Sequence, residues 1–265
     1  MRLVELKYEF IRTPLEQPLR RLRNLLEYPR RRRFPELREI YAEEQRIDAV
    51  LRQILRRDGN CIDVGCHYGS MLSRFCRLAP AGHHVAVEAI PAKVRFLRRK
   101  FPEVDVLEVA LSDHAGAEDF YINLAATGFS GLARHGEGHF ERIHVTCVRL
   151  DDAVPKDRRF DLLKIDVEGA ELFVLRGATA FLTRDRPTIL FECGPSGPPA
   201  FGYTAGTLYD LFVACGYSVF LLKDALNRGL PVVREQFEAA LVYPFKAFNW
   251  LAVASERITE VLAKS

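Results

Sequence analysis

The sequence predicts an α/β fold in which a mostly parallel β-sheet is covered by helices on both faces. From Cys61 onwards, short apolar segments alternate with segments of helical periodicity, which is the order that builds such sheets. A glycine-containing turn, Asp63–Gly69, lies between the first apolar segment and the first helical one. The length of 265 residues is enough for one large α/β domain plus an appendage. We therefore expect an N-terminal helical, Arg-rich extension over residues 1–58 and the α/β domain over residues 59–265.

The extension begins irregularly and ends in a long helical pattern. Four prolines interrupt its front part, namely Pro14, Pro18, Pro29 and Pro35. Apolar residues then recur at helical spacing from Glu36 to Arg57, and Asp58-Gly59-Asn60 ends that helix. This pattern predicts one helix over most of residues 36–57.

The α/β domain follows in order. The predicted strands are Cys61–Val64, His84–Glu88, Val104–Ala110, Asp119–Ile122, His144–Val148, Asp161–Asp166, Thr188–Glu192, Ser218–Leu222 and Trp250–Ala254. The predicted helices are Ser70–Leu78, Pro91–Lys100, Ala170–Leu175 and Thr207–Ala214, with one short turn at Leu150–Val154. Between the strands Asp119–Ile122 and His144–Val148 lies a glycine-rich loop, Thr127–Gly138. This loop either closes over substrate or is a disordered surface loop.

Composition is ordinary for a soluble globular protein, with 48% hydrophobic and 28% charged residues. No apolar run approaches the roughly 20 residues that span a bilayer, and the N-terminus lacks the apolar segment of a secretory signal. We therefore expect a cytoplasmic protein. Six scattered cysteines without zinc spacing indicate reduced thiols that act as small core residues.

Positive charge is concentrated in the extension, although the net charge is only +3. The arginines involved are Arg20, Arg21, Arg23 and Arg30–Arg33. Such a patch can hold phosphates, anionic lipid or RNA, and it can also be the solvated face of an accessory helix. The solvated face is our first interpretation, a peripheral anionic contact is the alternative, and we expect no nucleic-acid partner.

The turn Asp63–Gly69 predicts a ligand site. A strand, a glycine turn and a helix N-terminus together form a pocket of backbone N–H groups, and glycine lets a ligand approach the main chain closely. Asp63 adds a carboxylate, which suits a ligand with positive charge and hydroxyls better than a pyrophosphate. The D-x-G-x-x-x-G spacing departs from G-x-G-x-x-G, so a nicotinamide or flavin dinucleotide is disfavoured. A tight turn without a ligand is the alternative.

Two further segments carry acidic residues at predicted strand ends. Glu88 lies 19 residues after Gly69, which suits a carboxylate that binds ribose hydroxyls. Asp166 ends a strand that contains Lys164, a residue that needs a charge partner if it is buried and whose alternative role is a structural ion pair. Glu168 and Glu171 follow at a helix start, where capping can explain one of them.

These segments resemble one known family. Asp63–Gly69, Glu88–Pro91, Val109–Asp113, Leu163–Glu171 and Leu175–Ala178 are similar to the FkbM family of S-adenosylmethionine-dependent methyltransferases. The similarity runs from about Asn60 to Glu192, and Leu163–Glu171 is its most specific part. It implies a Rossmann-like class I methyltransferase domain with a seven-stranded sheet whose last strand is antiparallel. It also implies O-methylation of a hydroxyl on a small molecule or glycan.

The resemblance assigns roles by position. The implied cofactor-binding residues are Asp63, Gly65, His67, Gly69, Glu88, Leu111, Ser112, Asp113 and Asp166. Among them the turn residues would line the methionine side, Glu88 would hold the ribose, and Leu111–Asp113 would border the adenine. The chain has Cys66-His67 where the family commonly has Ala-Asn, and Ala89 where Pro is usual. We therefore expect His67 to contact the cofactor in a different way.

A hydroxyl is a poor nucleophile until a base takes its proton, while the protein aligns oxygen, methyl and sulfur. Asp166 is the first candidate base. The candidates behind it are Glu168, Glu192, His67 and His135. Carboxylates on adjacent strand ends could instead hold Mg²⁺, although no third ligand is evident. The Thr127–Gly138 loop contributes Phe129, Arg134 and His135 to the residues that could close over substrate.

Three other functions remain as alternatives. The arginine run is the only support for an RNA methyltransferase. A non-catalytic scaffold with a degenerate fold is opposed by the intact Asp63, Gly65, Glu88 and Asp166. A dinucleotide oxidoreductase lacks the third glycine of its motif.

Overall fold

A seven-stranded sheet forms the centre of the protein. The structure, a computed structural model, describes residues 7–16, 18–19, 22, 26, 28–134 and 138–263. The strand order is β3-β2-β1-β7-β8-β10-β9, and β10 runs antiparallel to both of its neighbours. The strands are β1 (Cys61–Val64), β2 (His84–Glu88), β3 (Asp105–Glu108), β7 (Leu162–Ile165), β8 (Thr188–Glu192), β9 (Tyr217–Leu221) and β10 (Asn249–Ala254). This sheet confirms the predicted fold class, including the antiparallel last strand.

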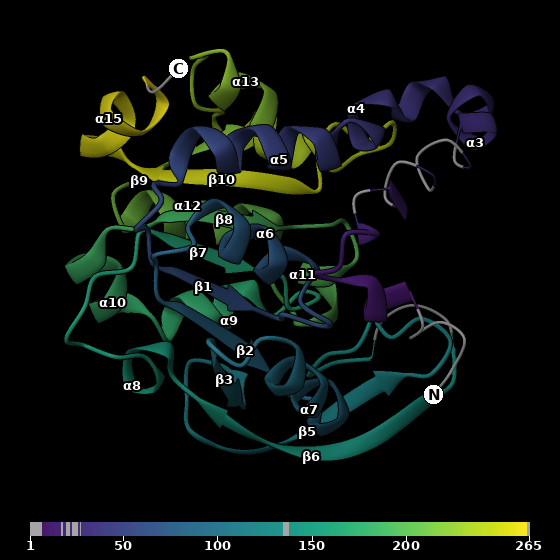
Figure 1. Cartoon of the computed structure of the whole chain (residues 1–265). Coiled ribbons are helices and arrows are strands. Elements are labelled where there is room, and N and C mark those ends of the chain that lie inside the picture. Colours follow the sequence, from purple (N-terminus) through teal and green to yellow (C-terminus); the bar gives the residue numbers. More distant parts are fainter. Residues whose placement is uncertain are drawn as a thin grey trace.

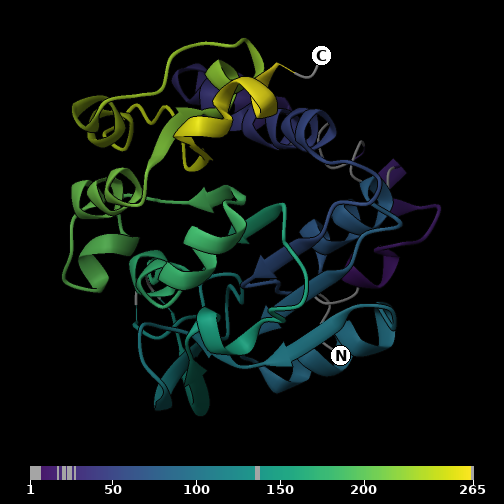
Figure 2. The ribbon, with the colours of Figure 1, turned by 90° about the vertical axis from the view of Figure 1, so that its left-hand side faces the viewer.

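Helices cover both faces of the sheet (Figures 1 and 2). On one face lie α5 (Glu43–Ile54), α6 (Ser70–Leu78), α7 (Pro91–Lys100), α13 (Leu222–Leu226) and α15 (Ile258–Leu262). On the other lie α8 (Leu150–Ala153), α9 (Glu171–Arg176), α10 (Thr179–Asp185), α12 (Ala205–Ala214) and α14 (Arg234–Ala240). The other helices whose bounds lie within the described residues are η1 (Lys7–Phe10), α3 (Tyr28–Arg33), η2 (Pro35–Leu37), α4 (Arg38–Tyr41), α11 (Gly197–Ala200) and η3 (Ser255–Arg257).

Side chains of the central strands alternate between two cores. Along β7, Leu163 and Ile165 pack with α9 and α12, whereas Leu162 packs on the opposite face with α5 and α6. Because successive side chains of a strand point to opposite faces, each short apolar strand contributes to both cores. A strand that is apolar along its whole length is therefore the expected sequence for this sheet.

A small second sheet carries the glycine-rich loop. It consists of β4 (Ala110–Leu111), β6 (Phe140–Val148) and β5 (Gly116–Asn123), in the order β4-β6-β5. The single strand predicted over Val104–Ala110 is wrong, because the chain leaves the central sheet after Glu108. Ala110 and Leu111 pair instead with Cys147 and Val148 of β6. The hairpin strands are longer than the predicted Asp119–Ile122 and His144–Val148.

The helix predicted over residues 36–57 is divided in the structure. It is replaced by η2, α4 and α5, and the last of these ends at Ile54 because Leu55 is extended. Helix α5 packs against α13 and α15 and contributes Ile47, Val50 and Leu51 to a core cluster. The division of the chain at residue 58 stays a prediction.

All six cysteines are free thiols, four of them buried. Within the described ranges, no helix combines the length and the apolar character that a membrane crossing requires.

Candidate active site

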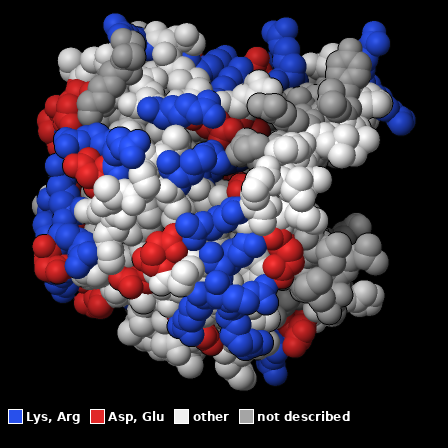
Figure 3. Space-filling view, viewed as in Figure 1, with Lys and Arg blue, Asp and Glu red and all other residues white. Residues whose placement is uncertain are grey.

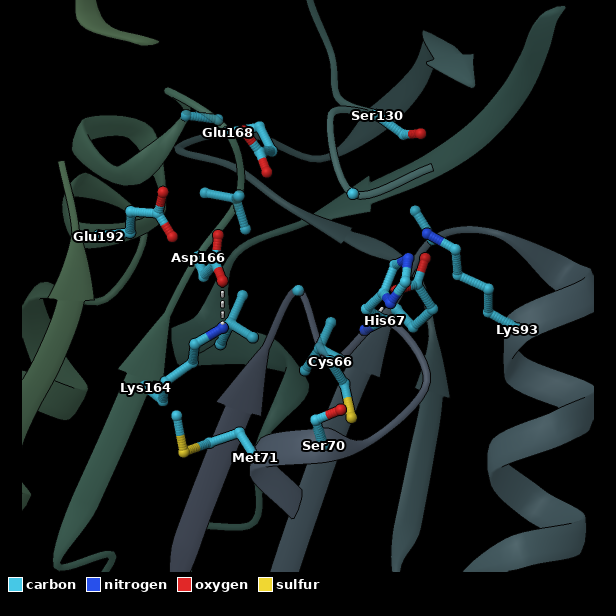
Figure 4. A pocket seen from close by; sticks show the side chains of 18 of the residues that line it. Cys66, His67, Ser70, Met71, Lys93, Ser130, Lys164, Asp166, Glu168 and Glu192 are labelled. Carbon is cyan, nitrogen blue, oxygen red and sulfur yellow. Dashed lines mark hydrogen bonds and ion pairs between the residues drawn. The ribbon is translucent and has the colours of Figure 1, made fainter. Parts of the chain in front are cut away.

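A cavity of about 450 Å³ opens at the carboxyl ends of β1, β2, β7 and β8, the edge of an open α/β sheet where ligands bind. Its walls come from many parts of the chain: the turn after β1, residues of β2, β4, β5, β7, β8 and β10, helices α4 to α7, the loop between β5 and β6, the segment after β7, and Tyr8 of η1. Figure 4 shows Asp166, Glu168 and Glu192 on one side and His67 and Lys93 on the other.

The turn after β1 needs its first glycine. Gly65 has a φ of +72°, and a Cβ at this position would lie 1.8 Å from the backbone oxygen of Asp166. Gly69 has a φ of +82° and packs against the ring of Phe101. His67, between them, has a φ of +54° although it carries a side chain. The ends of β1 and β7 therefore lie so close together at this turn that only glycine fits at position 65.

Glu88 is fixed at the end of β2. Its Oε2 accepts a hydrogen bond from the backbone N–H of His67 at 2.9 Å, and its Oε1 accepts one from Ile90 at 2.9 Å. Burial raises the pKa of Glu88, and the nearby ammonium of Lys93 opposes that rise. The carboxylate is thus held in one orientation against the turn, and each oxygen keeps a lone pair for a further donor.

The loop between β5 and β6 is fastened over the cavity through Thr127. Lys93 Nζ donates to the carbonyl oxygen of Thr127 at 3.0 Å, and Nε2 of His67 lies 3.2 Å from its Oγ1. Ser130 Oγ donates to the same carbonyl at 3.0 Å. Sequence reasoning missed Lys93, because a lysine on an amphipathic surface helix gives no signal that it points inward.

Not all of the loop faces the cavity. Gly128, Ser130 and Leu132 line it, whereas Phe129 is exposed. Arg134 lies over the ring of Tyr121, with 4.6 Å from its guanidinium carbon to the ring centroid. His135 lies outside the described residues. The loop is therefore in place to shield a bound ligand from water on this side.

Lys164 forms a buried ion-pair network at the end of β7. Its Nζ lies 2.8 Å from Asp166 Oδ2 and 3.8 Å from Asp63 Oδ1. Burial alone would lower the pKa of Lys164, but the carboxylates of Asp166 and Asp63 raise it above its ordinary value. The expected charge partner of Lys164 is confirmed, and Asp63 is completely buried behind it.

Two glutamates near Asp166 resist ionisation. Burial, with repulsion from Asp166, raises the pKa of Glu168 to about 8. Burial and the charges of Asp166 and Glu168 raise the pKa of Glu192 well above its ordinary value. Lys164 pairs with Asp166 at 2.8 Å, and its positive charge partly opposes the rise in the pKa of Glu168 and Glu192. A cation bound at this end of the cavity would therefore be favourable, because it would stabilise the ionised forms of these acids.

Glu171 has a structural role at the start of α9. Its Oε1 accepts hydrogen bonds from the backbone N–H groups of Val167 at 3.2 Å and Gly169 at 3.1 Å. Glu168, in contrast, lines the cavity and has a left-handed φ of +57°. Of the two acids for which capping was an explanation, Glu171 is thus the one that binds the backbone.

The cavity brings together most of the predicted site residues. Those that line it are Gly65, His67, Glu88, Leu111, Asp166, Glu168 and Glu192. Those that do not line it are Asp63, Gly69, Ser112 and Asp113. Ser112 is buried and its Oγ lies 3.4 Å from Asp113 Oδ1, so these two side chains interact with each other beside the cavity.

Part of the wall comes from residues that the sequence did not single out. Besides Lys93 these include Tyr8, Met71, Arg74, Glu43 and Ser130. Tyr8 stacks on Tyr68 with 4.4 Å between ring centroids and meets His67 edge-on at 5.2 Å. Residues far apart in the chain meet here only through the tertiary fold.

The metal alternative gains no support. In the part of the chain that the structure describes, no group of three or more His, Cys, Asp or Glu side chains is arranged to hold a metal ion.

Fold and site together define the class of protein. The strand order with an antiparallel β10, the glycine turn after β1 and the acid at the end of β2 are the features of a class I S-adenosylmethionine-dependent methyltransferase. A model of the methyltransferase FkbM domain matches residues 63–219, more than half of the chain. The chain therefore belongs to the FkbM family of methyltransferases.

Three known proteins are similar to this chain. The 2-O-methyltransferase NoeI of Sinorhizobium fredii is 30% identical over 160 residues, which are 52% of this chain and 66% of NoeI. The AMB antimetabolite synthetase AmbE of Pseudomonas aeruginosa is 29% identical over 218 residues, 66% of this chain and 10% of AmbE. The crystal structure of methyltransferase FkbM from Methylobacillus flagellatus KT has a TM-score of 0.46 and 14% identity, and the match covers 75% of this chain and 44% of that one. The chain thus spans about two thirds of NoeI and about a tenth of AmbE.

Proposed function

We propose that this methyltransferase transfers the methyl group of S-adenosylmethionine to a hydroxyl group of a small molecule or glycan, with a buried carboxylate as base. The observation that carries the proposal is the convergence of Asp166, Glu168 and Glu192 on one end of the cavity, opposite His67 and Lys93 (Figure 4). The relative NoeI, a 2-O-methyltransferase by name, supports oxygen as the atom that is methylated.

The residues present fit the cofactor. Glu88, already fixed by two backbone N–H groups, has lone pairs available for the ribose hydroxyls. Gly65 lines the cavity where the methionine part would lie, and Leu111 belongs to an apolar wall with Val109, Ala110 and Phe120 that suits the adenine. When bound, S-adenosylmethionine supplies a methyl group on a positively charged sulfur. The carboxylate of Asp166, and those of Glu168 and Glu192 when they are ionised, would stabilise that charge.

Asp63 and Gly69 have indirect roles in this proposal. Asp63 holds Lys164 from behind, and Lys164 in turn holds Asp166 at 2.8 Å. Gly69 allows the turn to pack on Phe101. Both residues therefore shape the cofactor cavity without lining it.

Glu168 is the best suited of the three acids to take the proton from the acceptor hydroxyl. A general base works best when its pKa lies near the operating pH, and burial raises the pKa of Glu168 to about 8. Asp166 is committed to Lys164, and the pKa of Glu192 is raised well above its ordinary value. In this scheme Asp166 and Lys164 orient the site while Glu168 accepts the proton.

The remaining wall suits a polar acceptor. Apart from Asp166, Glu168 and Glu192, the polar residues of the wall are Glu43, Glu44, Arg74 and Asn249, and Met71 and Ile47 are their apolar neighbours. Arg74 is held by Glu44 at 2.8 Å and by Asp48 at 3.1 Å. Fixed carboxylates and an amide are groups that accept hydrogen bonds from several hydroxyls at once.

Replacing Glu88 with glutamine is expected to weaken binding of S-adenosylmethionine by about tenfold to a hundredfold, because hydrogen bonds to a charged acceptor are lost. Isothermal titration calorimetry of the purified protein measures this change directly. The matched control is Glu141→Gln, an exposed acid on β6 that lies outside the cavity and should leave binding unchanged. Equal affinities of the Glu88→Gln variant and the wild type would remove Glu88 from the cofactor site.

The acceptor class is tested with radiolabelled S-adenosylmethionine and a panel of glycosides, hydroxylated small molecules and RNA. We expect label in a glycoside or small molecule, in a product that resists mild alkali, because a methyl ether is stable where a methyl ester is hydrolysed. Alkali-labile label would mean that a carboxylate is the acceptor. Label that enters RNA alone, in a salt-sensitive manner, would replace the proposed function with RNA methylation.

A further inference from the structure

A row of exposed leucines lies between η1 and α3. Leu15, Leu19, Leu22 and Leu26 follow one another at spacings of four, three and four residues, and their exposed fractions are 52%, 39%, 50% and 73%. The backbone N–H of Leu19 donates to the carbonyl of Leu15 at 3.0 Å, as in a helix. At these spacings helical side chains lie on one face. Exposing four large apolar side chains in a row to water is unfavourable, so this row indicates a contact surface.

Arginines accompany the leucines. Arg32, Arg33 and Arg38 are exposed, and the guanidinium carbon of Arg33 lies 5.6 Å from the ring centroid of Phe34, itself 38% exposed. The sequence places further arginines at positions 20, 21, 23, 30 and 31. Figure 3 shows basic side chains at the upper right, where α3 lies in Figure 1, next to uncharged surface. We call the exposed leucines Leu15, Leu19, Leu22 and Leu26, with Phe34, Arg32, Arg33 and Arg38, the leucine–arginine surface.

Two apolar residues from the other end of the chain lie beside this surface. The hydroxyl of Tyr243 donates to Glu36 Oε1 at 2.5 Å, which places the loop after α14 next to η2. Tyr243 and its neighbour Val242 are both largely exposed. The apolar area thus continues from the N-terminal segment onto the body of the protein.

We infer that the leucine–arginine surface docks onto a lipid bilayer with anionic headgroups. Apolar residues at helical spacing, in a stretch of sequence that is also rich in arginine, are the pattern of segments that lie in the plane of a membrane interface. Nucleic acid would be bound by the arginines but would leave the leucines in water. A merely solvated face would explain the arginines and not the leucines. Docking onto an anionic bilayer accounts for both the leucines and the arginines.

Both ends of the segment that carries the surface reach the cavity. The segment that carries it is bounded by the cavity-lining residues Tyr8 and Ile40. On the η1 side, Arg12 pairs with Glu103 at 2.6 Å, Glu9 with Arg99 at 2.6 Å, and Glu16 accepts from Ser73 Oγ at 2.9 Å. These contacts fix the start of the segment to α6 and α7. Docking would therefore bring the mouth of the cavity close to the bilayer.

Vesicle co-sedimentation tests the inference with the full chain and without any cofactor. The wild type is expected to sediment with vesicles of phosphatidylcholine and phosphatidylglycerol and to bind pure phosphatidylcholine about tenfold more weakly. Replacing Leu19, Leu22 and Leu26 with glutamine, or Arg32, Arg33 and Arg38 with glutamine, should each lower the affinity for anionic vesicles about tenfold. Circular dichroism and the thermal midpoint check that each variant is folded.

Matched controls separate this surface from the overall charge and hydrophobicity. Replacing the exposed Val213, Leu230 and Val233 with glutamine, or the exposed Arg57, Arg77 and Arg95 with glutamine, changes composition equally at other places and should leave vesicle binding intact. Failure of the wild type to bind anionic vesicles overturns the inference. Equal losses in test and control variants also overturn it, as does binding of poly(U) RNA that the leucine substitutions leave unchanged. Because no methyl transfer is measured, these outcomes are independent of the proposed function.

Discussion

Replacing Glu168 with glutamine is expected to lower kcat by about 10²- to 10⁴-fold, the usual contribution of a general base. Cofactor affinity should change little, because the amide keeps the shape of the side chain. Turnover at saturating cofactor and acceptor measures the first quantity, and calorimetric titration measures the second. Glu141→Gln on β6 is the control and should retain full activity.

If Glu168 is the general base, the reaction rate should rise with pH. A base must be ionised, and the pKa of Glu168 is raised to about 8 by burial and by repulsion from Asp166. The kcat/KM for S-adenosylmethionine, which reports the free enzyme, should therefore rise about tenfold between pH 7 and pH 9. In the cofactor complex the positive sulfur favours the carboxylate, so the rise in kcat should lie at lower pH.

Parallel variants distinguish Glu168 from its neighbours. If Asp166→Asn or Glu192→Gln abolishes turnover while Glu168→Gln stays active, the base is one of those two acids and the role proposed for Glu168 is wrong. Asp166→Asn also removes the nearer partner of the buried Lys164, so its stability must be measured alongside its activity. A folded, inactive Glu168→Gln variant with normal cofactor binding is the result that supports the proposal.

Replacing Gly65 with alanine is expected to destabilise the protein and to abolish cofactor binding. A φ of +72° costs a residue with a side chain about 1–3 kcal/mol, before any clash is counted. The added Cβ would also meet the Asp166 backbone oxygen at 1.8 Å, and a backbone atom cannot rotate away. The turn after β1 and the end of β7 must therefore separate, which distorts both sides of the cavity.

Thermal unfolding and calorimetric titration of the Gly65→Ala variant test this prediction. Gly116→Ala is the matched control, since a Cβ at Gly116 meets nothing within 4 Å and its φ is not in the left-handed region. The control should unfold close to the wild-type midpoint and bind the cofactor normally. Wild-type stability and binding in Gly65→Ala would show that the turn adapts, and that its glycine is dispensable.

Local patterns determined much of the fold. The strands Cys61–Val64, His84–Glu88 and Thr188–Glu192 and the helices Ser70–Leu78 and Pro91–Lys100 have the predicted bounds, because each is bounded by turn residues and has a clear period. Prediction from the sequence was wrong where strand pairing in the tertiary structure competed with the local pattern. Val104–Ala110 reads as one strand, yet its end leaves the central sheet to pair with β6. The long helical pattern after Glu36 is likewise divided, into η2, α4 and α5.

The sequence by itself determined the family, the glycine turn and the acids at the ends of β2 and β7, because these are short motifs with fixed spacing. Only the tertiary structure decided which of these groups face the cavity. Asp63 is hidden behind Lys164, whereas Lys93 and Tyr8, which no motif marks, form part of the wall. The pKa values of Glu168 and Glu192 likewise depend on burial and on the charges around them. Burial and proximity arise from contacts between distant parts of the chain, and no local sequence pattern records those contacts.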